Sequence, residues 1–140
     1  MELVTIEEYA AKLYIMDTSE LEDDVVFNMN YKRLSKARRA KIDSYYFEKD
    51  KRLSLGAGML LDRGLSDYGL KESEVSISYG ANGKPYLPME PHIHFNISHS
   101  GKIAVAVFAD VETGCDVELV QKADLSFAER FFCAGEYSYI

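Results

Sequence analysis

The chain has 140 residues, 47% of them hydrophobic, so it is long and apolar enough to fold as one domain with its own core. Its net charge of −7 argues against general binding to nucleic acid, and no apolar run approaches the roughly 20 residues of a membrane-spanning helix. The first residues lack the basic and apolar segments of a signal peptide, and the two cysteines lack metal-ligand spacing. We therefore expect a cytoplasmic protein with reduced thiols, with a disulfide between Cys115 and Cys133 as the alternative.

Helical patterns dominate the first half of the chain. A capping box at residues 5–8 predicts a short helical turn, and residues 12–16 are typical of a strand. A second capping box at residues 19–22 predicts a helix that runs towards Asn30. Ser35 is the predicted N-cap of a third helix, whose apolar positions keep a helical period: Ala37, Ile42, Tyr45 and Tyr46.

A longer helix is predicted from about residue 50 to residue 68. Its apolar stripe has helical spacing and consists of Leu53, Ala57, Leu60, Leu61 and Leu65. Gly56 and Gly58 lie inside this helix, where each glycine weakens it by about 1 kcal/mol unless it permits close packing.

The pattern changes to strands after residue 69. Alternation predicts one-sided strands in two places, at Val75, Ile77 and Tyr79 and again at Ile93, Phe95 and Ile97. A turn-rich loop occupies residues 79–85. Residues 103–108 are apolar on both faces, which predicts a central, buried strand, and residues 115–118 form a further strand.

Residues 127–132 resemble a helical stretch, and a second one begins at residue 134 and has no stop signal before Ile140. We therefore expect a chain that is truncated relative to a longer design. The predicted fold class is α+β, with a helical N-terminal half followed by an antiparallel β-meander.

Two carboxylates share one face of a predicted strand. Asp116 and Glu118 are two residues apart, so both point the same way. Adjacent carboxylates repel each other unless a cation or a proton is shared, and Mg²⁺ prefers such oxygen ligands. The alternative is an exposed polar strand edge, because this short pattern is common.

His99 lies at the end of a predicted strand between Ser98 and Ser100, where it can donate to a phosphate or act as a base. The alternatives are a structural histidine and ordinary turn serines. Lys84 precedes Pro85 in a loop, where it is either a ligand contact or a plain surface lysine.

The segment 32–52 holds nine of the 16 lysines and arginines of an otherwise acidic chain. Such a segment either faces an anionic ligand or forms a solvated helix face.

Four motifs in this order together resemble the surfactin-type (Sfp-type) 4′-phosphopantetheinyl transferases. They are GKP at 83–85, FNISHS at 95–100, GCDVE at 114–118, and RFF at 130–132 followed by Glu136. The resemblance extends from about Leu34 to the end of the chain. It implies transfer of the phosphopantetheine arm of coenzyme A to a serine of an acyl or peptidyl carrier protein, with release of 3′,5′-ADP.

The resemblance also implies roles for individual residues. Asp116 and Glu118 would bind the Mg²⁺ that bridges the pyrophosphate. Glu136 would be the base for the carrier serine, with His99 and Asp116 completing the catalytic set. Contacts with the phosphates or adenine of coenzyme A are implied for a larger group: Arg38, Lys41, Arg52, Gly83, Lys84, Pro85, Ser98 and His99.

The family fold consists of two similar α+β halves with coenzyme A between them. The resemblance implies that residues 1–140 correspond to one α+β domain, namely the N-terminal half plus the start of the linking helix. The next family motif, W-x-x-K-E, is absent, and the chain contains no tryptophan. The alternative function is therefore an incomplete half-domain that only binds coenzyme A, nucleotide or a partner chain, including a second copy of itself.

Overall fold

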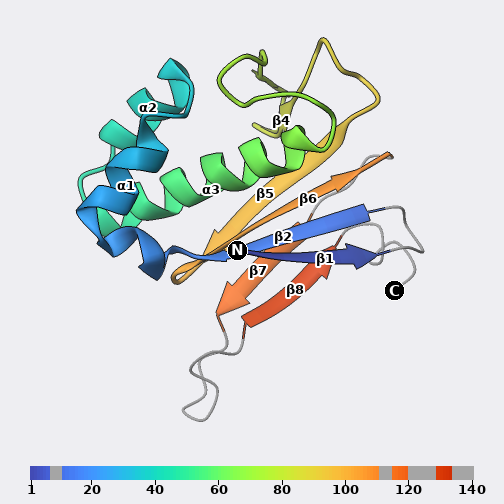
Figure 1. The fold of residues 1–140 in the computed structure, drawn as a ribbon. Coiled ribbons are helices and arrows are strands. Elements are labelled where there is room, and N and C mark those ends of the chain that lie inside the picture. The colour runs from blue at the N-terminus through green and yellow to red at the C-terminus, as the bar shows by residue number, and fades with distance from the viewer. Residues whose placement is uncertain (7–10, 111–114, 120–128, 134–140) are drawn as a thin grey trace.

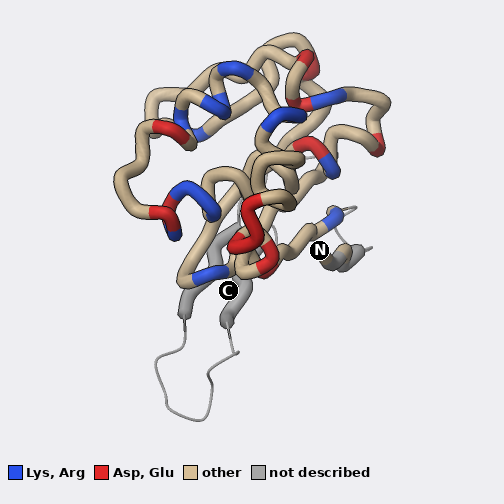
Figure 2. The backbone as a smooth tube through the Cα atoms, turned by 60° about the vertical axis from the view of Figure 1, so that its left-hand side comes forward, with Lys and Arg blue, Asp and Glu red and all other residues tan. Residues whose placement is uncertain are grey.

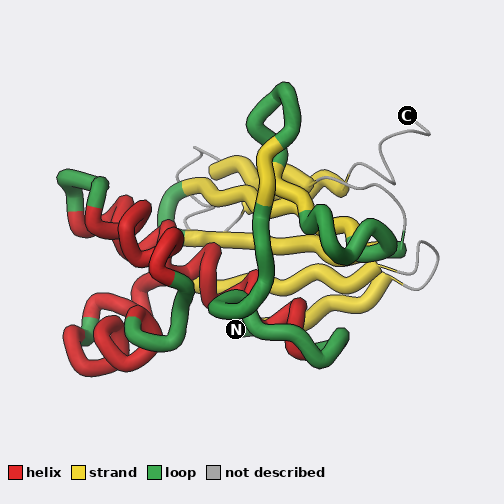
Figure 3. The backbone as a smooth tube through the Cα atoms, turned by 90° about the horizontal axis from the view of Figure 1, so that it is seen from above, coloured by secondary structure: helices red, strands yellow, loops and turns green. Residues whose placement is uncertain are grey.

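Three helices cover one face of an antiparallel β-sheet in the computed structural model (Figures 1 and 3). The structure describes residues 1–6, 11–110, 115–119 and 129–133. The helices are α1 (Asp24–Tyr31), α2 (Lys36–Asp43) and α3 (Glu48–Ser66). The strands of this sheet are β1 (Glu2–Ile6), β2 (Ala11–Asp17), β5 (His94–Ser100) and β6 (Ile103–Ala109). Helices on one face of an antiparallel sheet confirm the predicted α+β class.

The sheet has the strand order β1-β2-β6-β5, which places the apolar strand β6 at its centre. β6 pairs with β2 on one side, where Leu13 faces Val107, and with β5 on the other, where Phe95 faces Phe108. Residues 104–109 of β6 are all buried, which confirms the predicted central strand. The edge strand β1 and its neighbour β2 thus come from the half of the chain whose pattern is mainly helical.

Helix α3 is the main element packed on the sheet, and its predicted apolar stripe is buried in full. Its glycines bring neighbouring elements close. A Cβ at Gly58 would lie 2.6 Å from a methyl carbon of Leu34, and one at Gly64 would overlap the ring of Phe108. These glycines therefore permit close packing against the segment before α2 and against β6, which is the condition that offsets their low helix propensity.

A polar cluster fastens the C-terminal end of α3 to β2. The Tyr14 hydroxyl donates to Asp67, which also receives a hydrogen bond from Arg63 at 3.1 Å. Burial, followed by the Asp67 interaction, raises the pKa of Tyr14 to about 12. The Tyr14 hydrogen bond is also the main cause that lowers the pKa of Asp67.

Two local predictions in the N-terminal half need correction. Thr5 belongs to strand β1, so it does not cap a helical turn, and residues 7–10 lie outside the described residues. The second capping box opens a 3₁₀ helix at Thr18–Glu22, where Asp17 accepts from the Ser19 N–H. Asp23, which accepts from two N–H groups, is the actual N-cap of α1. In both cases an aspartate just upstream supplies the cap.

The predicted strand around Val75 is reduced to β3 (Ser78–Tyr79), which pairs with β4 (Pro85–Tyr86) across the turn-rich loop. Farther on, β7 (Cys115–Leu119) confirms the predicted strand and pairs with β8 (Glu129–Cys133). The helix predicted over 127–132 is therefore wrong in its second part, because pairing with β7 makes that part a strand. Cys115 and Cys133 are register partners in this pair.

Candidate functional site

A cavity of about 180 Å³ lies between the two helices α2 and α3 on one side and β5 with the β3–β4 hairpin on the other. Five residues predicted from the sequence line it, which are Arg38, Lys41, Gly83, Pro85 and His99. Its other lining residues are Tyr45, Ser54, Ala57, Leu61, Ile77, Tyr79, Phe95 and Ile97. The fold therefore brings together groups that are up to 61 residues apart in the sequence.

Helix α2 supplies the two cations of this cavity. The Ser35 hydroxyl accepts from the Arg38 N–H at 3.0 Å, which confirms Ser35 as the N-cap of α2. Arg38 and Lys41 are three residues apart, so they lie on the same side of the helix. The apolar Ile42, one turn after Arg38, anchors the helix in the core, with 1% of its surface exposed.

Ser35 is itself held from outside the helix. The buried carboxylate of Glu72 accepts from the Ser35 N–H at 2.6 Å and from its hydroxyl at 2.7 Å. The Glu72 N–H donates to Asp62 of α3 at 3.0 Å. The loop after α3 thus fixes the start of α2, and with it the position of Arg38.

The cavity is electropositive, although the chain as a whole is acidic. Figure 2 shows lysines and arginines recurring along the helical layer, with aspartates and glutamates among them. Within the described part of the chain, neither Arg38 nor Lys41 has an ion-pair partner, and no carboxylate lines the cavity. Partial burial, and then the charge of Arg38, lower the pKa of Lys41. Two uncompensated cations side by side are suited to an anionic ligand.

The turn between β3 and β4 forms the rim of the cavity. Gly83 has a φ of 78°, which only glycine adopts without strain, and its N–H donates to the Gly80 carbonyl at 2.9 Å. This turn places Gly83 and Pro85 in the wall of the cavity. Lys84 instead lines a neighbouring cavity of about 350 Å³, which shares Pro85 and Phe95 with the first one.

The remaining predicted residues lie elsewhere. Arg52 lies near the start of α3, is half-buried, and precedes the cavity residue Ser54 by two positions. Ser98 is half-buried in β5, next to His99. Glu136 lies outside the described residues.

The two predicted metal ligands both belong to β7, which runs close to β5. Positions 116 and 118 fall on one face of this strand and face Phe132 and Arg130 of β8 in the register. Among residues 1–6 and 11–110, no group of three or more potential ligands gathers. Carboxylate oxygens of the kind that Asp116 and Glu118 carry are suited to a hard divalent cation.

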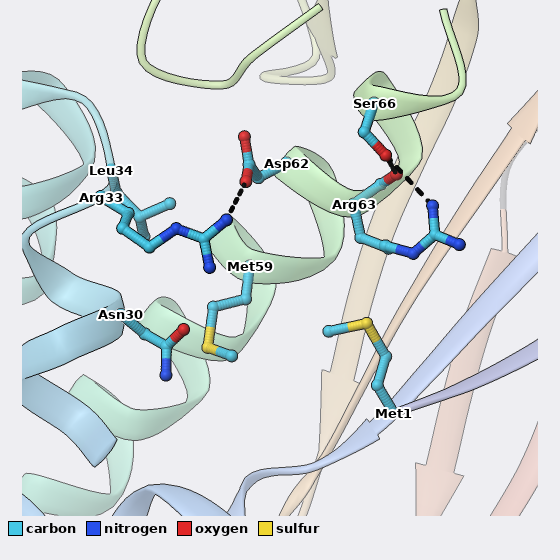
Figure 4. A pocket seen from close by; sticks show the side chains of 8 residues that line it. All are labelled: Met1, Asn30, Arg33, Leu34, Met59, Asp62, Arg63 and Ser66. Atoms are coloured by element: carbon cyan, nitrogen blue, oxygen red, sulfur yellow. Dashed lines mark hydrogen bonds and ion pairs between the residues drawn. The ribbon is translucent and has the colours of Figure 1, made fainter. Parts of the chain in front are cut away.

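A third cavity, of about 170 Å³, is lined by residues from α1 and the segment after it, from α3 and from the N-terminus (Figure 4). It also contains two arginines, but both are paired: Arg33 with Asp62 at 3.5 Å, and Arg63 with Asp67 at 3.1 Å. Figure 4 shows Arg33 pointing towards Asp62 and Arg63 bonding to Ser66. Compensated charge makes this cavity a poorer anion site than the one beside α2.

Sequence reasoning missed Ser54 and Glu72. Ser54 is two residues from Arg52 on a helix whose stripe is otherwise apolar, and a buried serine in that stripe is the signal that could have marked it. Glu72 contacts Ser35 across 37 residues, and no local pattern reports such a contact.

Comparison with known proteins places this architecture in a family. Residues 22–111 match the family model described as 4′-phosphopantetheinyl transferase, N-terminal. The chain therefore belongs to the 4′-phosphopantetheinyl transferase family, as the four motifs predicted. Among the described residues, no helix is both long and apolar enough to cross a membrane.

Its similar relatives carry the same name. The chain is 35% identical over 106 residues to 4′-phosphopantetheinyl transferase Sfp of Bacillus subtilis (strain 168), which covers 75% of this chain and 47% of that protein. It is 36% identical over 101 residues to 4′-phosphopantetheinyl transferase psf-1 of Bacillus pumilus, which covers 71% of this chain and 43% of that protein. The chain spans about half the length of these curated relatives.

Proposed function

We propose that the chain is the N-terminal half of a Mg²⁺-dependent 4′-phosphopantetheinyl transferase. This activity moves the phosphopantetheine arm of coenzyme A onto a serine of an acyl or peptidyl carrier protein and releases 3′,5′-ADP. The observation that carries the proposal is the cavity beside α2, which Arg38, Lys41 and His99 line and which has no carboxylate among its described lining residues. Coenzyme A carries a pyrophosphate and a 3′-phosphate, so its recognition requires such a cationic surface.

The size of the cavity supports binding of one end of coenzyme A by this half. Complete sites for small molecules occupy about 300–1,000 Å³, and this cavity has about 180 Å³. In our proposal the nucleotide phosphates contact Arg38, Lys41 and His99, with Arg52 and Ser98 nearby. Gly83, Lys84 and Pro85 then flank the adenine.

The chemistry itself is assigned to the sheet side of the site. Asp116 and Glu118 would hold Mg²⁺, which when bound neutralises charge on the pyrophosphate oxygens. Glu136 is proposed as the base that takes the proton of the carrier serine. His99 would donate a hydrogen bond to a non-bridging phosphate oxygen and so stabilise the charge that develops during displacement at phosphorus.

A half-domain that binds coenzyme A or nucleotide without catalysing transfer is the second candidate. The observation that favours it is the volume of the cavity beside α2, which at about 180 Å³ is smaller than a complete small-molecule site. Such a half-domain would need a complementing chain or a second copy of itself for activity. A strictly monomeric mass by light scattering, together with transfer activity, would exclude that requirement. We also propose a cytoplasmic location, where coenzyme A is available.

Two measurements on the 140-residue chain separate the candidates. Calorimetry with coenzyme A and Mg²⁺ tests binding, and mass spectrometry of an apo carrier protein tests the addition of phosphopantetheine. Transfer that Asp116→Ala abolishes, with the exposed Asp110→Ala as control, supports the transferase. Binding without transfer supports the half-domain. An absence of both binding and transfer would refute both candidates.

A further inference from the structure

One buried hydroxyl in the cationic cavity has no partner. Ser54 is 6% exposed, and within the described residues its oxygen makes no hydrogen bond. A serine inside a helix commonly bonds the carbonyl four residues earlier, which here belongs to Asp50, but Ser54 does not make this bond. A buried polar group without a partner destabilises a fold, so each such group requires a physical explanation.

The position of Ser54 indicates where its partner comes from. Ser54, Ala57 and Leu61 are spaced along one side of α3, and all three line the cavity that also contains Arg38 and Lys41. The other two positions on this side carry apolar groups. Ser54 is therefore the only residue with a hydrogen-bonding side chain that α3 contributes to the lining of the cavity among the described residues.

The charges around Ser54 identify the class of ligand atom. Arg38, Lys41 and His99 offer only donors when protonated, and none of the described residues that line the cavity is a carboxylate. A phosphate group presents more acceptor sites than two cations occupy, and a serine hydroxyl can donate to one of them. An uncharged donor adds a hydrogen bond without adding to the repulsion between the two cations.

We propose that Ser54 is a ligand-binding residue whose hydroxyl donates a hydrogen bond to a phosphate oxygen of the bound nucleotide. This inference rests on the proposed function, because coenzyme A is the phosphate source it invokes. It adds a neutral donor from α3 to the cations of α2. Ser54 also becomes a specificity residue, because an apolar side chain here would leave that phosphate oxygen without its donor.

The test combines affinity and stability for Ser54→Ala, with Ser66→Ala as the matched control. Ser66 is on the same helix, is exposed, and its hydroxyl already donates to the Arg63 carbonyl at 2.6 Å. We expect Ser54→Ala to weaken coenzyme A binding about tenfold, because hydrogen bonds to charged groups are among the stronger ones. We expect the unliganded variant to melt at the same temperature as the wild type or a higher one, since it loses an unpaired buried group.

Comparison of coenzyme A with 3′-dephospho-coenzyme A identifies the phosphate. A loss of affinity confined to coenzyme A places the contact at the 3′-monoester, and an equal loss for both ligands places it at the pyrophosphate. Unchanged affinity of Ser54→Ala, in a protein whose wild type binds coenzyme A, overturns the assignment of Ser54 and leaves the proposed function standing. A lower melting temperature of the unliganded variant also overturns it, because it reveals a partner within the protein. No binding by the wild type overturns both.

Discussion

Glu72 fixes the start of helix α2 through one residue, Ser35. Removal of the Glu72 side chain is therefore the sharpest test of how the site is built. Its carboxylate is 1% exposed and accepts two hydrogen bonds from Ser35, at 2.6 and 2.7 Å. Ser35 in turn caps the N–H of Arg38 at 3.0 Å. Glu72→Ala removes both bonds from Ser35 and leaves its N–H without an acceptor.

The expected cost follows from the number and kind of these bonds. A hydrogen bond to a charged group contributes about 1.5–3 kcal/mol to stability. Removal of the buried charge also removes its desolvation cost, which offsets part of the loss. We therefore expect Glu72→Ala to lower the free energy of unfolding by about 2–4 kcal/mol. Glu72→Gln keeps one acceptor oxygen and should cost about half as much.

Urea unfolding of the 140-residue chain measures this change, with the exposed Glu74→Ala as the control of equal charge. Calorimetry without urea, where the protein is folded, should also show weaker binding of coenzyme A to Glu72→Ala. The reason is that the start of the helix that carries Arg38 and Lys41 is no longer held in place. A free energy of unfolding within about 0.5 kcal/mol of wild type, with unchanged binding, would refute the reasoning, since that is the range of ordinary surface substitutions.

Three further predictions concern α3 and its surroundings. Gly64→Ala should lower the free energy of unfolding by about 2–3 kcal/mol in urea, because its Cβ overlaps the ring of Phe108; equal stability would contradict the close approach. Tyr14→Phe should cost about 1–2 kcal/mol at pH 7. Because the pKa of Asp67 is lowered, chiefly by Tyr14, its contribution is present above the ordinary value of 3.8 and lost as pH falls. The variant should therefore show a weaker loss of stability in acid, and an unchanged acid limb would exclude this coupling. For Lys41, whose pKa lies below its ordinary 10.5, calorimetry should show coenzyme A affinity falling as pH rises through that lowered pKa, and Lys41→Gln should abolish this dependence.

The sequence correctly predicted those elements whose structure depends on residues within the same segment. The stripe of α3 and the doubly apolar strand β6 are both buried as expected, because helical spacing and continuous apolar character are properties of a single segment. Ser35 caps α2 for the same reason, since a cap depends on neighbours within three residues. The family resemblance then predicted five residues that line one cavity.

Features that depend on distant partners were not predictable in this way. The pattern of residues 127–132 suits a helix locally, but pairing of Arg130 with Glu118 makes β8 a strand. A short apolar run is compatible with a helix or a strand, so the segment with which it pairs determines which of the two it forms. The pairing of β2 with β6 and the contact of Glu72 with Ser35 likewise join segments that no local pattern connects.

The departures from ordinary folding rules gather at one place, and this clustering is the physical argument for a ligand. Lys41 is partly desolvated beside Arg38, although an acidic chain offers many carboxylates that could have paired with it. Ser54 keeps a buried hydroxyl that has no partner among the described residues. Each departure lowers the stability of the empty protein, and natural sequences retain such departures chiefly at functional sites. A phosphate group in this cavity would reverse both at once: it would raise the pKa of Lys41 again and give Ser54 an acceptor. Coenzyme A should therefore stabilise the wild type more than it stabilises Lys41→Gln or Ser54→Ala, because stabilisation by a ligand grows with its affinity.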